Sequence, residues 1–355
     1  MTTPTQRFSP CPTPFSDHVY KTVQGVDIPL RIWPATGPEA NQGPRPWLLW
    51  YHGGGFIAGK HAIPNAWVVP AFRSRGYHVV SAAYRFIPHV NLDDIVTDTI
   101  DAHAWCRLHL ADILAQTDGK VDIDALVVGG DSAGGTLSTL AGHKLSPPPR
   151  VVVDVFGVVD LTDPHMTGEG VDPDSPAAVM LRSIPLSGAF TAEQVATALA
   201  ETDPSKAEVI APWSWEMDPN MDLATLQSFW GMPSFKVDPA HTLRMDMLLQ
   251  MSKDSSMGRL LVRPKDAAGH KDLDDSQVLA AQLRKWSSSL MLNDKDNYPP
   301  TFFLHGHKDR AVPIAQSQRM AAKLREMGIP TAEAYSPDGD HCFENVIEVS
   351  FGKIE

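Results

Sequence analysis

Residues 130–134 read Gly-Asp-Ser-Ala-Gly and stand between an apolar segment, residues 125–129, and a helix-forming segment, residues 133–145. A G-x-S-x-G sequence at a strand-to-helix turn holds its serine on a strained backbone and lifts the hydroxyl clear of a sheet. Small residues at 130 and 134 let such a turn approach its neighbours, and a helix N-terminus favours developing negative charge. This context predicts that Ser132 is a nucleophile; the alternative is a glycine-rich turn with no chemical role.

Segments typical of strands and of helices alternate on both sides of Ser132. Continuous β-branched runs such as residues 150–159 are typical of parallel strands buried on both faces, and the alternation favours a mostly parallel α/β sheet flanked by helices. The predicted strands are residues 18–23, 26–33, 47–51, 77–83, 125–129, 150–159, 301–305 and 331–335. The predicted helices are residues 66–75, 92–110, 133–145 and 314–327, with a short helix after His341.

This pattern divides the chain into three parts. Residues 1–16 are polar and proline-rich and are expected to form a flexible lead-in. Residues 17–162 and 299–355 carry the alternation and form the predicted α/β core. Residues 163–298 have few strand signals and are rich in Trp and Met, so we expect a mostly helical cap over the active site. For any single Trp or Met there, plain packing between helices is the better prediction.

A second glycine-rich segment, His52-Gly53-Gly54-Gly55, follows a short apolar run. Successive glycines allow peptide N–H groups to face a cavity without interference from side chains. Acyl transfer needs such donors because the carbonyl oxygen becomes an oxyanion in the tetrahedral intermediate. The segment is therefore expected to supply one part of an oxyanion hole, and Ala133, the residue after the nucleophile, the other part.

A serine hydroxyl is a weak nucleophile at neutral pH and needs a base. Of the 14 histidines, His341 follows the last predicted strand, as the order serine, acid, histidine requires. Asp309 follows the preceding strand and is the expected acid, which would orient the imidazole of His341 and stabilise its charged form. Asp338 and Asp340 are alternatives that lie close to His341 in sequence, and Asp309 could instead cap the helix that begins near Val312.

His305 and His307 form an H-x-H pair, which is a common element of metal sites. Neither a carboxylate nor a third histidine completes a convincing ligand set nearby, so no metal is expected. The acyl-transfer chemistry predicted for Ser132 requires no organic cofactor either.

Composition limits the possible partners. Lys and Arg total 30 against 42 for Asp and Glu, a formal net charge of −12, which disfavours nucleic acid and anionic lipid. Cys11, Cys106 and Cys342 have no disulfide or zinc spacing, so a reducing compartment fits. No apolar run reaches the roughly 18 residues that span a bilayer, and no secretory signal is visible. We expect a soluble cytoplasmic protein; its oligomeric state cannot be read from the sequence.

Together these motifs resemble the hormone-sensitive-lipase-like branch of the α/β-hydrolases, a group of carboxylesterases. Residues 52–55 resemble its HGGG oxyanion motif, residues 130–134 its GDSAG elbow, and residues 84–88, Tyr-Arg-Phe-Ile-Pro, its YRLAP segment. The resemblance implies an α/β-hydrolase fold in which Gly54, Gly55 and Ala133 donate to the oxyanion. It spans most of the chain and is weakest in the middle insertion.

The sequence departs from that branch at two places. His89 stands where the branch commonly has Glu. The acid segment, residues 305–313, reads HGHKDRAVP and looks more like the G-x-x-D-x-x-V-P segment of other α/β-hydrolases.

Three functions fit these residues. The first is hydrolysis of a small-molecule carboxylic ester through an acyl-enzyme, with Ser132, His341 and Asp309 as a triad. The second keeps the triad but acts on one pathway metabolite as a lactonase, deacetylase, amide hydrolase or acyltransferase, because similar chains serve as tailoring enzymes of natural-product pathways. The third is a non-catalytic small-molecule receptor on the same fold. Some relatives of the branch are such receptors and have lost the histidine, so the retention of all three residues counts against this function.

Overall fold

One eight-stranded sheet organises the molecule. The computed structural model describes residues 13–36, 43–62, 67–169, 182–211, 239–264, 275–293 and 297–345, together with residues 172, 174, 179 and 273. The strand order is β1-β2-β4-β3-β5-β6-β7-β8, antiparallel for the β1–β2 and β2–β4 pairs and parallel for every other pair. The strands are β1 (Ser16–Val23), β2 (Val26–Trp33), β3 (Arg45–Tyr51), β4 (His78–Ala82), β5 (Val121–Asp131), β6 (Val151–Val155), β7 (Thr301–Gly306) and β8 (Thr331–Ser336). The predicted mostly parallel α/β sheet is confirmed.

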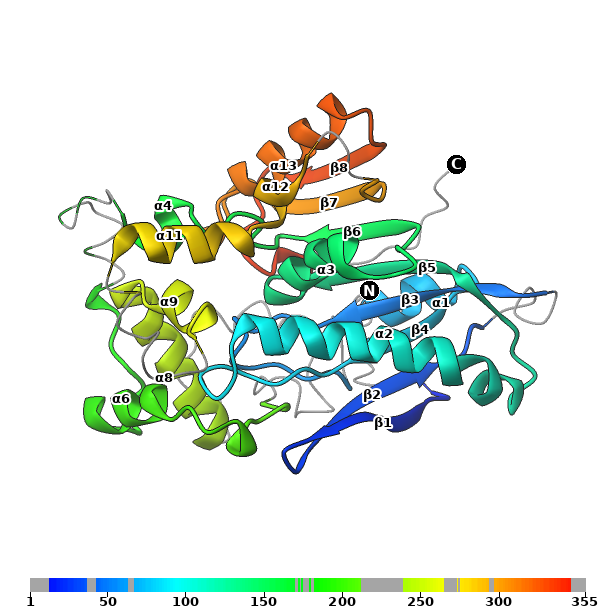
Figure 1. The fold of residues 1–355 in the computed structure, drawn as a ribbon, viewed down its shortest axis with the longest axis horizontal. Coiled ribbons are helices and arrows are strands. Elements are labelled where there is room, and N and C mark those ends of the chain that lie inside the picture. Colours follow the sequence, from blue (N-terminus) through cyan, green and yellow to red (C-terminus); the bar gives the residue numbers. More distant parts are fainter. Residues whose placement is uncertain are drawn as a thin grey trace, which may run out of the picture.

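Helices cover the sheet and also gather beyond one end of it (Figure 1). Those that connect strands are α1 (Val68–Arg73), α2 (Leu92–Ala115), α3 (Ala133–Lys144) and α13 (Ala315–Glu326). Those between β6 and β7 are α4 (Pro164–Thr167), α6 (Ala192–Ala200), α8 (Pro239–Asp254), α9 (Met257–Leu261), α11 (Ser276–Lys285) and α12 (Ser288–Met291). Two short 3-10 helices, η1 (Pro204–Lys206) and η3 (Phe343–Asn345), complete the described set.

β3 shows why this sequence forms a buried central strand. Trp47, Leu49 and Tyr51 pack into the larger apolar cluster, which includes residues of α2 and α3, whereas Leu48 and Trp50 pack into the cluster that includes residues of α1. Successive side chains of a strand point to opposite faces. A strand covered on both faces is therefore apolar at every position, as residues 47–51 are.

The two largest differences between predicted and observed strand boundaries have local reasons. β6 ends at Val155 rather than at residue 159, because Phe156 adopts a φ of +42° and turns the chain out of the sheet. β5 begins at Val121 rather than at residue 125, because Val121 pairs with Arg45 of β3. The polar residues Asp122 and Asp124 hide this extension in the sequence.

The described parts of residues 163–298 contain helices and one isolated bridge, between Ala211 and Gly59. Trp286 in this interval is 7% exposed, and the ammonium groups of Lys144 and Lys285 lie 5.5 and 5.3 Å from its ring, so it packs as part of the core. Trp213, Trp215 and Trp230, like residues 1–12 of the expected lead-in, lie outside the described residues. The division into lead-in, core and cap stays a prediction.

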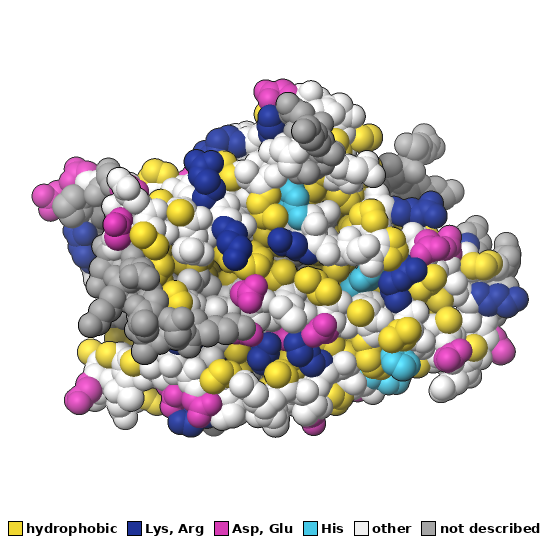
Figure 2. Space-filling model, in the orientation of Figure 1, with side chains coloured by type: hydrophobic (Ala, Val, Ile, Leu, Met, Phe, Trp, Pro, Cys, Tyr) yellow, Lys and Arg dark blue, Asp and Glu magenta, His cyan; other side chains and the backbone are white. Residues whose placement is uncertain are grey.

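The described surface carries both signs of charge. On the face in Figure 2, basic and acidic side chains are interspersed among hydrophobic ones. Among the helices that the structure describes, none combines the length with the apolar character that crossing a bilayer would require.

A buried ion pair ties α2 to the loop after β4. The carboxylate of Asp98 has no exposed surface and accepts hydrogen bonds from Nε and Nη2 of Arg85, each at 2.9 Å. It also accepts from the ammonium of Lys21 on β1 at 2.8 Å. Asp98 thus joins three segments that are distant in sequence.

We expect Asp98→Asn to lower the free energy of unfolding by about 3 kcal/mol or more, because it leaves the buried guanidinium of Arg85 without its nearest carboxylate. Urea denaturation measures the change. Asp124→Asn is the matched control: it breaks a pair with Arg107 whose carboxylate side chain is 64% exposed, so it should cost less than about 1 kcal/mol. Equal losses in the two variants would contradict the role given to Asp98.

Candidate active site

The turn between β5 and α3 holds Ser132 in a strained conformation. Its φ of +52° and ψ of −117° lie outside the regions that a serine ordinarily adopts. Its N–H donates to the carbonyl of Val155 at 2.8 Å, which fixes the turn beside the end of β6. A Cβ on Gly134 would lie 1.9 Å from the carbonyl oxygen of Tyr51, and one on Gly130 would lie 2.3 Å from Gly134. Only glycine fits these two positions, as the motif predicts.

The structure brings the predicted base and acid to this serine. Nε2 of His341 lies 3.0 Å from Oγ of Ser132, and Nδ1 of His341 lies 2.8 Å from Oδ2 of Asp309. A carboxylate only accepts hydrogen bonds, so Nδ1 of His341 carries the hydrogen and Nε2 accepts the hydroxyl proton of Ser132. The three residues follow β5, β7 and β8, and parallel strands deliver such loops to one edge of a sheet.

Asp309 is enclosed by hydrogen-bond donors. Its side chain has no exposed surface. Oδ1 accepts from the N–H groups of Ala311 and Val312 at 2.9 and 2.8 Å, while Oδ2 faces both His341 and, at 3.3 Å, Nε2 of His305. Burial raises the pKa of Asp309, but the hydrogen bonds from His305 and His341 outweigh burial and hold that pKa well below its usual range. The carboxylate is therefore charged at neutral pH.

The same contacts describe the residues of the alternative interpretations of this region. Oδ1 of Asp309 does close a turn onto Val312, but α13 begins only at Ala315, so this turn does not cap the helix. Asp338 accepts from the ammonium of Lys308 at 2.5 Å, and Asp340 accepts from Nε of Arg310 at 2.7 Å. The two alternative acids thus pair with the neighbours of Asp309 and bind the acid loop to the histidine loop.

The predicted oxyanion loop lies against the elbow. Oδ2 of Asp131 accepts from the N–H of Gly53 at 3.0 Å, and Oδ1 accepts from Nε1 of Trp50 at 3.1 Å. Gly54 and Gly55 have φ of +118° and +62°, which turn the peptide groups of the loop. Within the described residues, no acceptor contacts the N–H groups of Gly54, Gly55 or Ala133.

The sequence did not indicate the tether formed by Asp131, because the second position of G-x-S-x-G is unspecified. Burial raises the pKa of Asp131 to about 6, against the hydrogen bonds from Trp50 and Gly53. Tyr84, in the segment that resembles YRLAP, adds a second support: its hydroxyl donates to the carbonyl of His52 at 2.8 Å. Its ring stacks on that of His52 at 4.5 Å.

Helix α8 covers the oxyanion loop. A Cβ on Gly55 would lie 2.7 Å from Cδ1 of Leu248, so this leucine sits directly over the predicted donor. Arg244, one turn earlier, is 3% exposed and donates through Nη1 to the carbonyls of Ile57 and Ile87 at 3.0 and 3.1 Å. Neither contact had a signal in the sequence, because nothing in residues 239–254 fixes the direction of the helix.

The H-x-H pair does not converge on a common point. His305 is fully buried and bonds to Ser317 and Val312, whereas His307 is exposed and lies 5.9 Å from the ring of Tyr335. The described residues contain no group of three or more His, Cys, Asp or Glu side chains placed to hold a metal ion.

The fold and this geometry define a protein of the α/β-hydrolase class, and two family models match the chain. A family described by the alpha/beta hydrolase fold matches residues 48–211, which contain the oxyanion loop and Ser132. The prolyl oligopeptidase family matches residues 233–349, which contain Asp309 and His341. The chain belongs to the α/β-hydrolase superfamily.

Solved structures share this fold. An esterase from Thermogutta terrifontis superposes with a TM-score of 0.51 at 18% identity, covering 92% of this chain and 83% of the esterase. An esterase from Pyrobaculum calidifontis superposes with a TM-score of 0.53 at 18% identity, covering 94% of this chain and 78% of that one. At this level of identity the likeness concerns the fold.

Curated relatives are much longer than this chain. A non-reducing polyketide synthase of Acremonium egyptiacum is 27% identical over 337 residues, which is 92% of this chain but 14% of the synthase. A non-reducing polyketide synthase of Preussia isomera is 27% identical over 338 residues, again 92% of this chain and 13% of the synthase. The chain therefore resembles one segment of these synthases.

We expect Gly134→Ala to lower the free energy of unfolding by about 3 kcal/mol or more, because its Cβ would meet the backbone of Tyr51 rather than a movable side chain. Urea denaturation followed by circular dichroism measures the loss. Gly258→Ala is the matched control in another helix, where the nearest atom, Cδ2 of Leu283, lies 3.1 Å away and can shift. It should stay within about 1 kcal/mol of wild type. Similar stabilities for the two variants would show that the elbow is not closely packed.

Proposed function

We propose that the chain is a serine hydrolase that cleaves carboxylic esters of small molecules through an acyl-enzyme. The observation that carries this proposal is the continuous hydrogen-bonded series from Ser132 Oγ through His341 to Asp309, with distances of 3.0 and 2.8 Å. The α/β-hydrolase fold supports it, as do the N–H groups of Gly54, Gly55 and Ala133, which have no acceptor among the described residues.

In the proposed reaction, His341 takes the hydroxyl proton of Ser132 as Oγ forms a bond to the ester carbonyl carbon. The carbonyl oxygen becomes an oxyanion that accepts from the N–H groups of Gly54, Gly55 and Ala133. The carbon–oxygen bond to the alcohol then breaks, and the alcohol leaves with the proton from His341. A water molecule next gives a proton to His341 as its oxygen attacks the acyl carbon. His341 then returns the proton to Oγ of Ser132 as the acyl–serine bond breaks, which releases the carboxylic acid and restores the enzyme. Asp309 stays ionised throughout and stabilises the charged imidazole.

The proposal includes an organisation of the chain. Residues 17–162 and 299–355 form the catalytic core, residues 163–298 form a mostly helical cap, and residues 1–16 are a lead-in. The position of Leu248 over Gly55 and the bridge between Ala211 and Gly59 support a cap that bounds the substrate site. The part of the cap that lies beside the proposed oxyanion donors is apolar, which suits the acyl part of a small-molecule ester.

A second candidate substrate is an acyl group from a polyketide pathway. It is favoured by one observation: relatives that match 92% of the chain are named non-reducing polyketide synthases. An ester, a lactone or a thioester of such an acid would react through the same oxyanion and acyl-enzyme. Deacetylation, amide cleavage or transfer of the acyl group to another acceptor would use the same residues.

A non-catalytic receptor on this fold is disfavoured, because His341 lies within hydrogen-bonding distance of both Ser132 and Asp309. Covalent labelling of Ser132 by a fluorophosphonate distinguishes the two classes. A receptor with an inactive serine would not react.

We expect Ser132→Ala to reduce hydrolysis of p-nitrophenyl butyrate at least about 10³-fold, because it removes the nucleophile. We expect Asp309→Asn to reduce it about 10³–10⁴-fold, because the imidazole of His341 then loses its tautomer and orientation. Release of p-nitrophenol measures both. Asp338→Asn is the control: its ion pair with Lys308 is 87% exposed at the carboxylate, so the rate should stay within about threefold of wild type. Full activity in Ser132→Ala would exclude Ser132 as the nucleophile, full activity in Asp309→Asn would exclude Asp309 as the acid, and an equal loss in Asp338→Asn would show that the loss is not specific to Asp309.

We expect Leu248→Ala to raise kcat/KM for p-nitrophenyl benzoate relative to p-nitrophenyl acetate about tenfold, because it removes the side chain that lies over Gly55. Steady-state kinetics with the two esters give the ratio. Leu108→Ala, at a residue on α2 that is 74% exposed, is the matched control and should leave the ratio unchanged. An unchanged ratio in Leu248→Ala would show that α8 does not limit the acyl group.

A further inference from the structure

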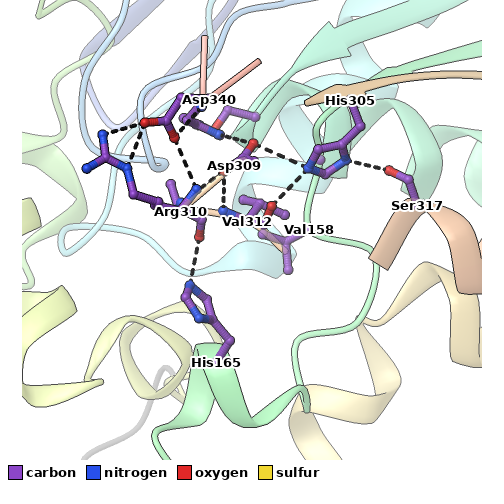
Figure 3. A network of polar contacts seen from close by, with 12 residues as sticks. Val158, His165, His305, Asp309, Arg310, Val312, Ser317 and Asp340 are labelled. Atoms are coloured by element: carbon purple, nitrogen blue, oxygen red, sulfur yellow. Dashed lines mark hydrogen bonds and ion pairs between the residues drawn. The ribbon is translucent and has the colours of Figure 1, made fainter. Parts of the chain in front are cut away.

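His305 is a buried histidine that neither the family motifs nor the proposed triad uses. It lies on β7 with no exposed surface. Nδ1 lies 2.8 Å from Oγ of Ser317 on α13, and Nε2 lies 2.9 Å from the carbonyl oxygen of Val312 and 3.3 Å from Oδ2 of Asp309. Figure 3 shows the ring held between Ser317 on one side and Asp309 with Val312 on the other.

These contacts define which nitrogen carries the hydrogen. Both partners of Nε2, a carbonyl and a carboxylate, only accept, so Nε2 must be the donor. In the neutral ring Nδ1 then accepts, and the hydroxyl of Ser317 donates to it. The two acceptors at Nε2 therefore select the tautomer that presents an N–H to Asp309, and the hydroxyl of Ser317 completes it at Nδ1.

Oδ2 of Asp309 is thus shared by two histidines. His341 approaches it at 2.8 Å and His305 at 3.3 Å, while Oδ1 is occupied by the N–H groups of Ala311 and Val312. The carboxylate cannot rotate without breaking several of these bonds at once. We infer that His305 is a positioning residue that acts through Asp309, by fixing the carboxylate in the orientation that meets His341 and by drawing part of its negative charge away from that ring. This inference rests on the proposed function of the triad.

A buried histidine can also be a satisfied part of the core, and His78 is an example. It is 1% exposed, its Nδ1 accepts from the N–H of Ala35 at 3.0 Å, and its Nε2 lies 3.1 Å from the carbonyl oxygen of Lys120. It is the first residue of β4 and lies at the amino ends of the parallel strands, whereas Ser132 follows the carboxyl end of β5. His305 differs because one of its partners is the predicted acid.

The ring of Phe156 also packs near both His305 and His341, with centroid distances of 6.3 and 4.7 Å.

The sign of the electrostatic effect follows from this sharing. Loss of the donor on His305 leaves more negative charge on Oδ2, which strengthens the attraction between this oxygen and the charged imidazolium of His341. Other titratable and charged groups around the pair remain in place: Asp131 on β5, Asp154 on β6, Ser132, Arg310, and Asp340, Cys342 and Glu344 beside His341. A change in the pH dependence of Ser132 reactivity on substitution of His305 therefore reports the contribution of His305.

The test is the rate of Ser132 labelling by a fluorophosphonate as a function of pH, which needs no knowledge of the natural substrate. We expect His305→Phe to lower the plateau rate about tenfold and to move the midpoint of the acid limb upward by about half a pH unit. His305→Gln restores both toward wild type, because its side-chain amide can donate from the position of Nε2. Ser317→Ala moves the midpoint in the same direction by less, since Nδ1 loses the hydroxyl that holds the ring of His305 against Asp309.

His78→Phe is the matched control. It removes an equally buried histidine, lowers stability and leaves the midpoint unchanged. An unshifted midpoint in folded His305→Phe, or a shift of equal size in His78→Phe, would overturn the inference. If His305→Phe does not fold, Ser317→Ala decides alone, and an unshifted midpoint in that variant overturns the inference. A wild-type chain that is not labelled at any pH would instead refute the proposed function, so the two failures are distinguishable.

Discussion

The closeness of β3 to the turn after β5 is the constraint on which the site depends. The carbonyl of Tyr51 occupies the space that a Cβ on Gly134 would need, at 1.9 Å. This approach allows Ser132 to hold a φ of +52° at the very end of the strand. The loop that leaves β3 then starts beside the serine, and Asp131 can reach Gly53 with a single hydrogen bond. The proposed oxyanion donors and the proposed nucleophile therefore share one rigid corner, and β7 and β8 deliver the other two groups to it.

Much of this arrangement follows from patterns that the sequence displays. The run that predicts β3 is apolar at every position, and the run that predicts β6 is rich in valine, because apolar side chains pack on both faces of the sheet. The order of Ser132, Asp309 and His341 along the chain matches the order of the strands that precede them. Local signals thus predicted the sheet, the elbow and the three residues that the structure brings within hydrogen-bonding distance.

What the sequence could not predict depends on contacts between distant segments. His305 stood in the sequence only as half of an H-x-H pair, and its bond to Ser317 requires α13 to pack on β7. The positive φ of Phe156, which ends β6 early, has no signature in an aromatic residue. The direction of α8 over Gly55 is set by packing against the core. These features depend on tertiary contacts, so no sequence periodicity or motif indicates them.

One consequence of the Arg244 contacts concerns motion. The guanidinium of this residue on α8 is bonded to the carbonyls of Ile57 and Ile87, and it lies 5.4 Å from the ring of Phe86. Moving α8 away from the sheet would break both hydrogen bonds and leave the two carbonyls without this donor. It would also pull on the segment that carries Gly54 and Gly55. Displacement of this helix and distortion of the predicted oxyanion loop are thus mechanically coupled.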